Sequence, residues 1–296
     1  MIRTGKKFSK PQMSRVVNGD LELSDTPQKI DKKRLDHILV EQHPEFNRST
    51  LQAFIREGRV KVDGKLVQKP NTQVTPDAKI TFDAPTSQKH LPKLPVIYED
   101  ENVLVINKPA GLLSMAKGEY CAEPTLEDYG LLVHRLDRDT SGVVILAKNP
   151  DTQKMLRKQF QDRKTHKTYY AIVEGHPAQP EALIDLPIIR NYKHPTTFMV
   201  DASGKDSQTH YKVIKQNDNF SLLELKPKTG RTHQLRVHLQ YLGNPIVGDP
   251  VYGSDSENSM ASPRLYLHAY QLEITIPQGQ RKIFTAPIPE EFDRVF

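Results

Sequence analysis

Two short apolar stripes with helical spacing begin the patterned part of the chain. Apolar side chains repeat at intervals of three and four within 35–39 and again within 51–55, and Asn47 can cap the second stretch. Two short apolar runs around 60–67 are separated by an Asp-Gly turn, and another run follows at 80–82. The pattern predicts a helix pair followed by a small sheet.

Longer apolar runs in the second part of the chain have the length and composition of strands. They are rich in β-branched and aromatic residues and are bounded by polar or glycine-containing turns. The predicted strands cover 103–106, 143–147, 169–173, 211–214, 222–225 and 272–276. Two helices interrupt them. One starts at Pro150 with Asn149 as its cap, and the other covers about 232–242 and ends at Gly243.

These patterns divide the chain into four segments. The basic, polar sequence over 1–30 has no strand or helix period, which predicts a flexible basic tail. Proline-rich sequence over 85–95 cannot continue a helix or a central strand, so we interpret it as a linker. We therefore expect a small helix-pair-plus-sheet domain over 31–84 and a sheet-dominated domain over 96–296. The fold class is α+β.

Composition narrows the class of protein. The 296 residues carry a formal net charge of +6, with 36% hydrophobic and 26% charged residues, which is typical of a globular protein of two domains. No stretch could span a bilayer or act as a signal peptide, so we expect a cytoplasmic protein without membrane contact. The single cysteine, Cys121, excludes an internal disulfide. The modest positive charge favours a polyanionic partner only slightly.

A dense charged motif precedes the predicted strand at 143–147. It runs from His134 to Gly142 as HRLDRDTSG and surrounds Asp137 with basic side chains. Nearby positive charge favours the anionic form of a carboxylate, which can then act as a nucleophile or base. A structural network of ion pairs has the same pattern. The motif by itself leaves both interpretations open.

A second motif leads from a predicted strand through a glycine turn into the helix at 232–242. It runs from Pro227 to Leu239 as PKTGRTHQLRVHL. Polar residues at 233, 236 and 240 form one face of this helix beside a stripe of leucines at 235, 239 and 242. The helix can therefore pack and also present Arg236 to a partner, although an amphipathic helix with a solvated face has the same spacing.

Taken together, the motifs resemble the signatures of the RluA-type pseudouridine synthases. The three signature segments are HRLD with TSG at 134–142, KTYYA at 167–171 and GRTHQLRVH at 230–238. Further matching segments are NKPAG at 107–111, GNPIVGD at 243–249 and FTAP at 284–287. The resemblance covers about 96–292 and implies a mixed, mainly antiparallel central sheet.

The smaller predicted domain resembles the alpha-L RNA-binding motif of ribosomal and RNA-modifying proteins. The matching segments are RLD at 34–36, an RS pair and IREGRV within 48–60, and VDG at 62–64. The resemblance implies contacts of the second helix and the following turn with RNA phosphates. The candidate RNA-binding residues are Arg48, Ser49, Gln52, Arg56 and Arg59. A solvated helix face is the alternative interpretation.

The resemblance implies that selected uridines in structured RNA are isomerised to pseudouridine without a cofactor or a metal. It assigns the catalytic carboxylate to Asp137, the ion-pair partner of this carboxylate to Arg236, and a ring that stacks on uracil to Tyr169. Two routes remain open. Asp137 either attacks the sugar or base, or it removes a ribose proton to give a glycal.

The same resemblance supplies the remaining candidates for the substrate pocket. Leu235 is expected to line it, and His134 belongs to the same motif as the catalytic carboxylate. A uridine inside a stem must leave its stack before it can react, and Arg135 is the candidate to fill the vacated space. We expect a monomer that acts on large-subunit ribosomal RNA, with transfer RNA as the alternative substrate.

Two other functions are compatible with parts of the sequence. A metal hydrolase could use His134, Asp137, Asp139 and His238 as ligands. A non-catalytic RNA-binding or ribosome assembly factor would require a change at the aspartate, tyrosine or arginine of the three signatures, and all three are present. The connection at 112–130 departs from the family pattern, and this bears on the choice of substrate rather than on the chemistry.

Overall fold

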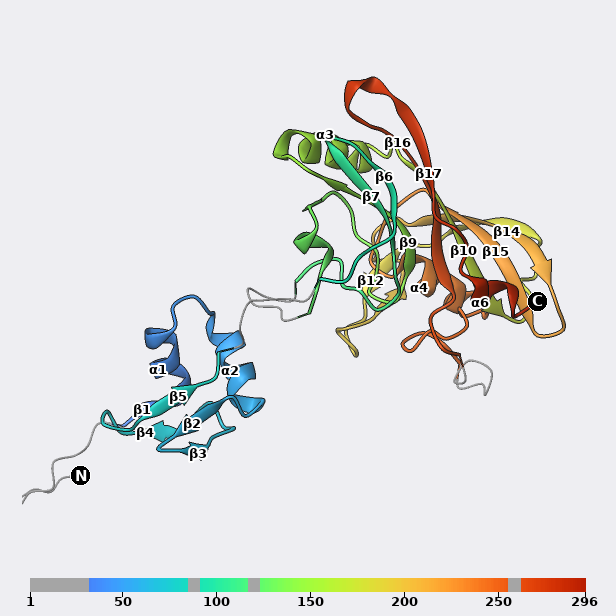
Figure 1. The fold of residues 1–296 in the computed structure, drawn as a ribbon. Coiled ribbons are helices and arrows are strands. Elements are labelled where there is room, and N and C mark those ends of the chain that lie inside the picture. Colours follow the sequence, from blue (N-terminus) through green and yellow to red (C-terminus); the bar gives the residue numbers. More distant parts are fainter. Residues whose placement is uncertain (1–31, 85–90, 117–122, 255–261) are drawn as a thin grey trace, which may run out of the picture. The chain divides into compact units, whose positions relative to one another are not determined.

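The computed structural model describes residues 32–84, 91–116, 123–254 and 262–296 (Figure 1). The chain forms two compact units, Met1–Asp83 and Ala84–Phe296. The predicted tail over 1–30 lies outside the described residues, as do residues 85–90 of the predicted linker. No helix in the described part of the chain is long and apolar enough to cross a membrane.

The smaller unit consists of two helices and short strands. Its elements are α1 (Leu35–Gln42), α2 (Arg48–Arg56), β1 (Lys33–Arg34), β2 (Val60–Val62), β3 (Lys65–Leu66), β4 (Gln73–Val74) and β5 (Ile80–Phe82). Strands pair in the order β3-β2-β5, and β1 pairs with β4. The Asn47 side chain caps α2 by accepting a hydrogen bond from Thr50 N at 2.9 Å. Asp63 and Gly64 both have positive φ, as a tight hairpin turn requires.

The predicted apolar stripes form the core of this unit. Leu35, Leu39, Leu51 and Ile55 from the two helices are fully buried, as is Val60 at the start of β2. Each helix therefore buries one face and leaves its polar face to solvent. The predicted helix pair with a small sheet is confirmed.

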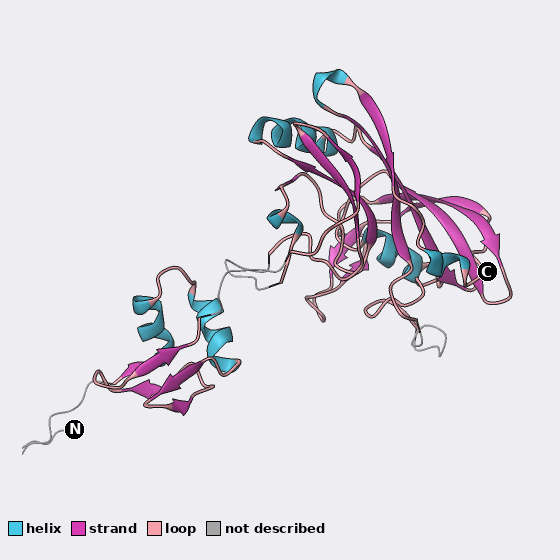
Figure 2. Ribbon diagram, in the orientation of Figure 1, coloured by secondary structure: helices cyan, strands magenta, loops and turns pink. Residues whose placement is uncertain are grey.

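A ten-stranded sheet dominates the larger unit (Figure 2). Its strands are β6 (Val96–Glu99), β7 (Val103–Lys108), β8 (Leu131–Leu132), β9 (Ser141–Ala147), β10 (His166–Glu174), β11 (Glu181–Asp185), β14 (Gln208–Gln216), β15 (Phe220–Pro227), β16 (Leu267–Thr275) and β17 (Arg281–Thr285). The main order is β11-β14-β15-β10-β16-β9-β7-β6, while β17 pairs with β16 and β8 with β9. Among the strand pairs of the described residues, only β9 and β16 run parallel. The expected mixed, mainly antiparallel sheet is confirmed.

Helices and one hairpin accompany this sheet. The helices are α3 (Pro150–Gln161), α4 (Gln234–Tyr241) and α6 (Glu290–Asp293), with 3-10 turns η1 (Leu126–Asp128) and η2 (Pro277–Gly279); the hairpin pairs β12 (Ile188–Arg190) with β13 (Phe198–Val200). Helix α4 begins later than predicted because His233 has a φ of 56°, in the left-handed region. Leu242 is 40% exposed, so its predicted place in the buried leucine stripe is wrong.

The parallel contact between β9 and β16 explains the glycine that follows Ser141. Gly142 has a φ of 117°, and a Cβ added there would lie 2.2 Å from the carbonyl oxygen of Ala269. Only glycine permits this approach of two backbones. The loop at 133–140, which leads into β9, is therefore fixed at the middle of the sheet, and this loop carries Asp137.

Candidate active site

A cavity of about 480 Å³ lies where several segments of the larger unit meet. Its walls come from the loop at 133–140, from the end of α3 and the turn that leads into β10, from β10 itself, from the start of β16, and from the segment at 227–236 that ends β15 and begins α4. All six residues predicted for the catalytic and substrate sites line this cavity: Asp137, Arg236, Tyr169, Leu235, Arg135 and His134. The fold thus brings together three motifs that are far apart in the sequence.

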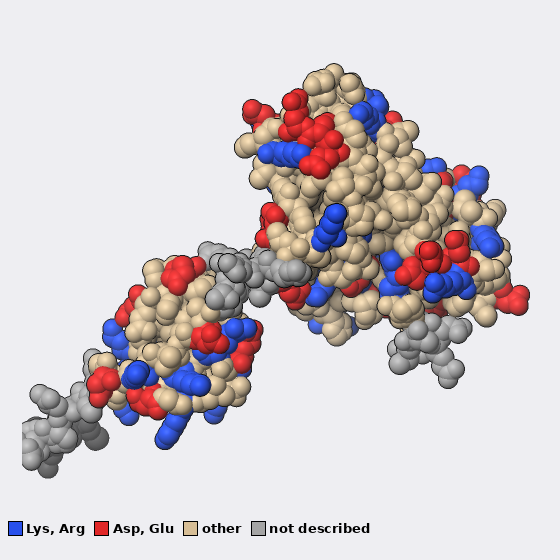
Figure 3. All heavy atoms as spheres, in the orientation of Figure 1, with Lys and Arg blue, Asp and Glu red and all other residues tan. Residues whose placement is uncertain are grey.

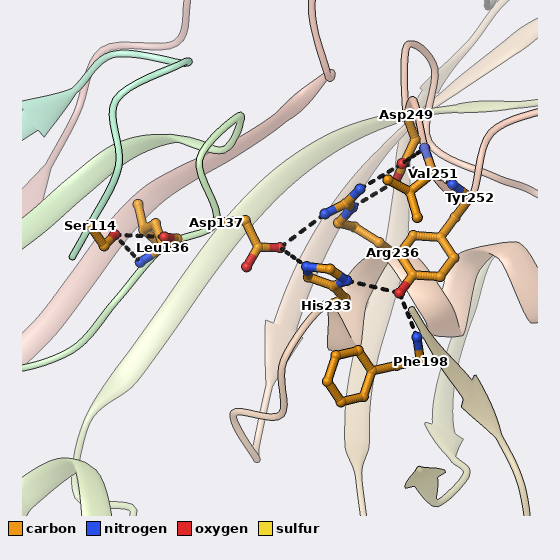
Figure 4. Close-up of polar contacts among 9 residues, drawn as sticks. All are labelled: Ser114, Leu136, Asp137, Phe198, His233, Arg236, Asp249, Val251 and Tyr252. Atoms are coloured by element: carbon orange, nitrogen blue, oxygen red, sulfur yellow. Dashed lines mark hydrogen bonds and ion pairs between the residues drawn. The ribbon is translucent and has the colours of Figure 1, made fainter. Parts of the chain in front are cut away.

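The Asp137 carboxylate is held through one of its two oxygens (Figure 4). Oδ2 accepts a hydrogen bond from Arg236 Nη1 at 3.3 Å, and His233 Nε2 lies 3.9 Å from the same atom. Oδ1 has no hydrogen-bond partner among the described residues. The side chain retains 19% exposure. One oxygen of a positioned carboxylate is therefore available on the cavity wall.

Arg236 contacts Asp137 but is held mainly by another acid, Asp249. Its Nε and Nη2 atoms each donate to a different oxygen of Asp249 at 2.7 Å, in the bidentate geometry that suits guanidinium and carboxylate. Burial alone would raise the pKa of Asp249, but the hydrogen bonds and charge of Arg236 outweigh this effect and lower it. Asp249 also accepts hydrogen bonds from the backbone N–H groups of Val251 and Tyr252. The predicted ion pair is thus part of a triad.

A neighbouring loop clamps the backbone on both sides of Asp137. The Ser114 hydroxyl donates to the Leu136 carbonyl at 2.6 Å and accepts from the Leu136 N–H at 3.1 Å. Lys108, which is fully buried, donates to the carbonyls of Pro109, Leu112 and Arg138. Burial lowers the pKa of Lys108 to about 7, but three acceptors match the three N–H groups of its ammonium form.

Tyr169 and Leu235 give the cavity an apolar wall. Tyr169 is half-buried, and its pKa is raised first by burial and then by the charge of Asp137, so the phenol stays neutral. Leu235 is 7% exposed and belongs to the core that packs α4 against the sheet. A flat ring and an aliphatic side chain beside a carboxylate suit a planar, uncharged base.

His134 and Arg135 occupy different environments although they are adjacent. His134 Nε2 accepts a hydrogen bond from the Ile145 N–H at 3.2 Å, and its ring stacks on Phe160 at 4.6 Å. Burial lowers the pKa of His134 to about 3, which keeps the ring neutral as this acceptor role requires. Arg135 is exposed, and its Nη1 lies 3.7 Å from the sulfur of Met115. Of the two, only Arg135 has a side chain that can reorient on binding.

Positive groups surround the cavity. Besides Arg135 and Arg236, the basic residues in its walls are Arg163, Lys167, Lys228 and Arg231. On the face drawn in Figure 3, Lys and Arg lie among Asp and Glu in both units. The excess of cations around a single catalytic candidate, Asp137, favours an anionic substrate.

The alternative metal site is not assembled by this fold. Both ring nitrogens of His238 are occupied, by Thr209 Oγ1 at 3.0 Å and by the Leu186 carbonyl at 2.9 Å. His134 uses Nε2 for the backbone of β9. Over the described residues no group of three or more His, Cys, Asp or Glu could hold a metal ion.

In the smaller unit, part of the predicted RNA-binding set is engaged within the fold. Arg48 and Gln52 donate to Oδ2 of the fully buried Asp36. Ser49 donates to the Asn47 side chain at 2.6 Å. The other two candidates lie near the end of α2: Arg59 pairs with Glu57 at 3.0 Å, and Arg56 is exposed.

Sequence reasoning predicted no role for several residues that build the site, among them His233, Lys108, Asp249, Tyr252 and Ser114. Asp249 and Tyr252 lie in or next to a segment that matched the family pattern, but no role was predicted for either. Ser114 lies in the connection that departs from that pattern. The available signal was Asp249 at the end of the GNPIVGD segment that follows α4, because an acid close to a buried arginine in sequence is a natural partner for it.

Comparisons with known proteins agree with this geometry. The family described as RNA pseudouridylate synthase matches residues 102–241, and the S4 domain family matches residues 33–80. A solved structure, human RNA pseudouridylate synthase domain containing 1, is 30% identical and has a TM-score of 0.59, covering 66% of this chain and 83% of its own.

Curated relatives extend the match over both units. Ribosomal large subunit pseudouridine synthase D of Borreliella burgdorferi is 38% identical, with 88% of this chain and 87% of the relative aligned. Dual-specificity RNA pseudouridine synthase RluA of Escherichia coli K12 is 42% identical, with 66% of this chain and 94% of the relative aligned. The chain therefore belongs to the RluA-type RNA pseudouridine synthases and carries an N-terminal S4 RNA-binding domain.

Proposed function

We propose that this pseudouridine synthase modifies uridines of large-subunit ribosomal RNA and that Asp137 is its catalytic carboxylate. The assignment of Asp137 rests on the different surroundings of its two carboxylate oxygens in the cavity. Arg236 holds Oδ2, and Oδ1 has no partner among the described residues. A carboxylate that is fixed in place and incompletely coordinated is suited to react with a bound molecule.

The reaction breaks the bond between ribose C1′ and uracil N1, turns the base, and joins C1′ to C5. The uracil hydrogen at C5 is lost as a proton and N1 gains one, so neither redox change nor hydrolysis occurs. Oδ1 of Asp137 is the group that attacks the nucleotide or removes the ribose proton. Arg236 holds the carboxylate in place through Oδ2, so that Oδ1 faces the nucleotide.

The remaining cavity residues bind and orient the nucleotide. The Tyr169 ring stacks on the uracil, and Leu235 packs against its edge. Extruding the nucleotide from a stem costs on the order of a few kcal/mol. Arg135, whose exposed side chain lines the cavity, fills the vacated position in the RNA.

The ribosomal substrate is supported by the extent of the alignments. The relative named for the large ribosomal subunit matches 88% of this chain, whereas the dual-specificity relative matches 66%. The S4 domain supplies an additional RNA-binding surface, with Arg48, Ser49, Gln52, Arg56 and Arg59 as candidate contacts. Transfer RNA is the alternative substrate.

Mapping pseudouridines in a strain that lacks the gene, with and without complementation, tests both the substrate and the role of Asp137. We expect specific sites in large-subunit ribosomal RNA to be lost, to return with the wild-type gene, and to stay absent with Asp137→Asn. Loss confined to transfer RNA would overturn the substrate assignment. Recovery of the sites with Asp137→Asn would overturn the assignment of the carboxylate.

A further inference from the structure

The Tyr252 hydroxyl has two close partners, and their chemistry fixes the direction of both hydrogen bonds. The backbone N–H of Phe198 lies 2.8 Å from the hydroxyl oxygen and can only donate. His233 Nδ1 lies 2.8 Å from the same oxygen. No other acceptor for the hydroxyl proton exists among the described residues. Tyr252 therefore donates its proton to His233 Nδ1 (Figure 4).

This direction determines the tautomer of His233. Because Nδ1 accepts a hydrogen bond, the proton of the neutral ring must reside on Nε2. Nε2 is the atom 3.9 Å from Asp137 Oδ2. Burial lowers the pKa of His233 more than the charge of Asp137 raises it, so the neutral ring is the form present near pH 7.

The surroundings hold His233 in a conformation that it would not adopt alone. Its φ of 56° is uncommon for a residue with a side chain, so the backbone there is strained. Phe198 and Tyr252 contact the imidazole edge-on, each with ring centroids 5.5 Å away. Strained residues kept in place by their neighbours concentrate at functional sites.

We propose that His233 is a positioning residue, which presents Nε2–H to Asp137 Oδ2 and so leaves Oδ1 to face the substrate. The proposal rests on the proposed catalytic role of Asp137. A separation of 3.9 Å exceeds hydrogen-bond length, and such contacts commonly shorten to about 3 Å when substrate closes the site. Tyr252 acts through His233 by fixing its tautomer.

The charges around His233 determine how the site responds to pH. Asp137, Asp249, Arg236 and Arg135 all act on the ring. Protonation would turn Nδ1 into a donor and leave the Tyr252 hydroxyl proton without an acceptor among the described residues. The network therefore resists protonation, and Tyr252→Phe should raise the pKa of His233.

The tautomer can be measured without activity. Long-range ¹H–¹⁵N spectra of the full-length protein at pH 7 should show the Nε2–H pattern for one imidazole that is missing from His233→Gln. An Nδ1–H tautomer or an imidazolium at that position would overturn the proposal whatever role Asp137 has.

Single-turnover kinetics at saturating RNA test the positioning role. His233→Leu removes the donor and should lower the rate about tenfold or more, whereas His233→Gln keeps an N–H near the Nε2 position and should recover most of it. RNA affinity should change little in either variant. His176→Gln, which alters an exposed histidine outside the cavity, controls for the substitution itself.

The two histidine variants separate the outcomes. Equal rates for His233→Leu and the wild type, or equal impairment in both variants while they stay folded, would overturn the positioning role. Normal turnover by Asp137→Asn would instead remove the proposed function, and the tautomer measurement would still stand by itself.

Discussion

Each unit of this protein places an aspartate among arginines, but the two carboxylates are held differently. Asp36 in the smaller unit is fully buried and accepts side-chain hydrogen bonds from Arg34, Arg48 and Gln52, which occupy both of its oxygens. Asp137 in the larger unit keeps 19% exposure, and only Oδ2 contacts described neighbours. The same residue types thus produce a saturated carboxylate in one place and an incompletely coordinated one in the other.

The difference separates a structural acid from a reactive one. Burial opposes the charge of Asp36, yet its donors outweigh burial and lower its pKa well below the usual range. Such a group stabilises a fold and has no oxygen left for another molecule. The charge motif around Asp137 was compatible with either type, and coordination rather than the number of nearby cations distinguishes them.

Breaking the support of Arg236 should lower both the stability of the protein and its rate. Asp249→Asn removes the charge that holds this buried arginine, which then turns fully to Asp137 and withdraws it from the substrate. We expect a loss of about 3 kcal/mol in unfolding free energy and about a 10²-fold lower single-turnover rate. Denaturant unfolding and single-turnover assays measure both. Asp218→Asn, at an exposed acid, should match the wild type in both assays.

Replacing Asp36, whose two carboxylate oxygens both accept hydrogen bonds, should affect stability but not the reaction rate. Asp36→Asn leaves Arg34 and Arg48 without their shared anion, but these arginines are half-exposed and regain water, so we expect a cost of about 2 kcal/mol in the smaller unit. Chemistry at saturating RNA should be unchanged. A rate defect comparable to that of Asp249→Asn would show that the two acids do not differ in the proposed way.

The pH dependence of the unfolding free energy of the larger unit tests whether His134 has a structural role. Its pKa is lowered to about 3 by burial, whereas an unfolded chain binds the proton near 6.5. Stability should therefore fall as pH drops from 6.5 towards 3, by up to about 1.4 kcal/mol per pH unit for this group. Above pH 6.5 it contributes no pH dependence. His134→Gln should flatten the slope of unfolding free energy against pH, and His176→Gln should leave it as in the wild type.

The smallest expected effect compares two arginines of α2. Arg56 is exposed, whereas Arg48 is bound to Asp36. Arg56→Ala should weaken RNA binding several-fold and reduce the slope of log affinity against log salt by about one unit. Arg48→Ala should lower stability more than affinity. RNA-binding titrations at several salt concentrations, together with thermal unfolding, measure both effects. A larger loss of RNA affinity in Arg48→Ala than in Arg56→Ala would contradict the prediction.

Local patterns predicted most of the elements, and long-range contacts explain what they missed. The stripes at 35–39 and 51–55 and the runs that became β7, β9 and β10 were recognisable because each buries one repeating set of side chains. The start of α4 was not, since the left-handed backbone of His233 is fixed by Phe198 and Tyr252 from other segments.

For the site as well, local motifs predicted some residues, whereas others depend on long-range contacts. Motifs placed Asp137, Arg236 and Tyr169 around one cavity, but spacing could not show which acid holds Arg236 most tightly. That acid is Asp249, on a loop beyond the end of the helix. The Ser114 clamp on Leu136 joins positions 22 residues apart in sequence and depends on how two loops pack. Side chains of this kind become visible only when the chain is folded.

Single-turnover pseudouridine formation by Asp137→Asn at saturating RNA, measured beside Asp36→Asn, tests the central distinction most directly. The amide keeps the shape of Asp137 but loses the charge and basicity of Oδ1. We predict a rate lower by at least about 10³-fold for Asp137→Asn, with RNA affinity and melting temperature close to the wild type, and a wild-type rate for Asp36→Asn. A folded Asp137→Asn variant that forms pseudouridine at the wild-type rate would contradict the account.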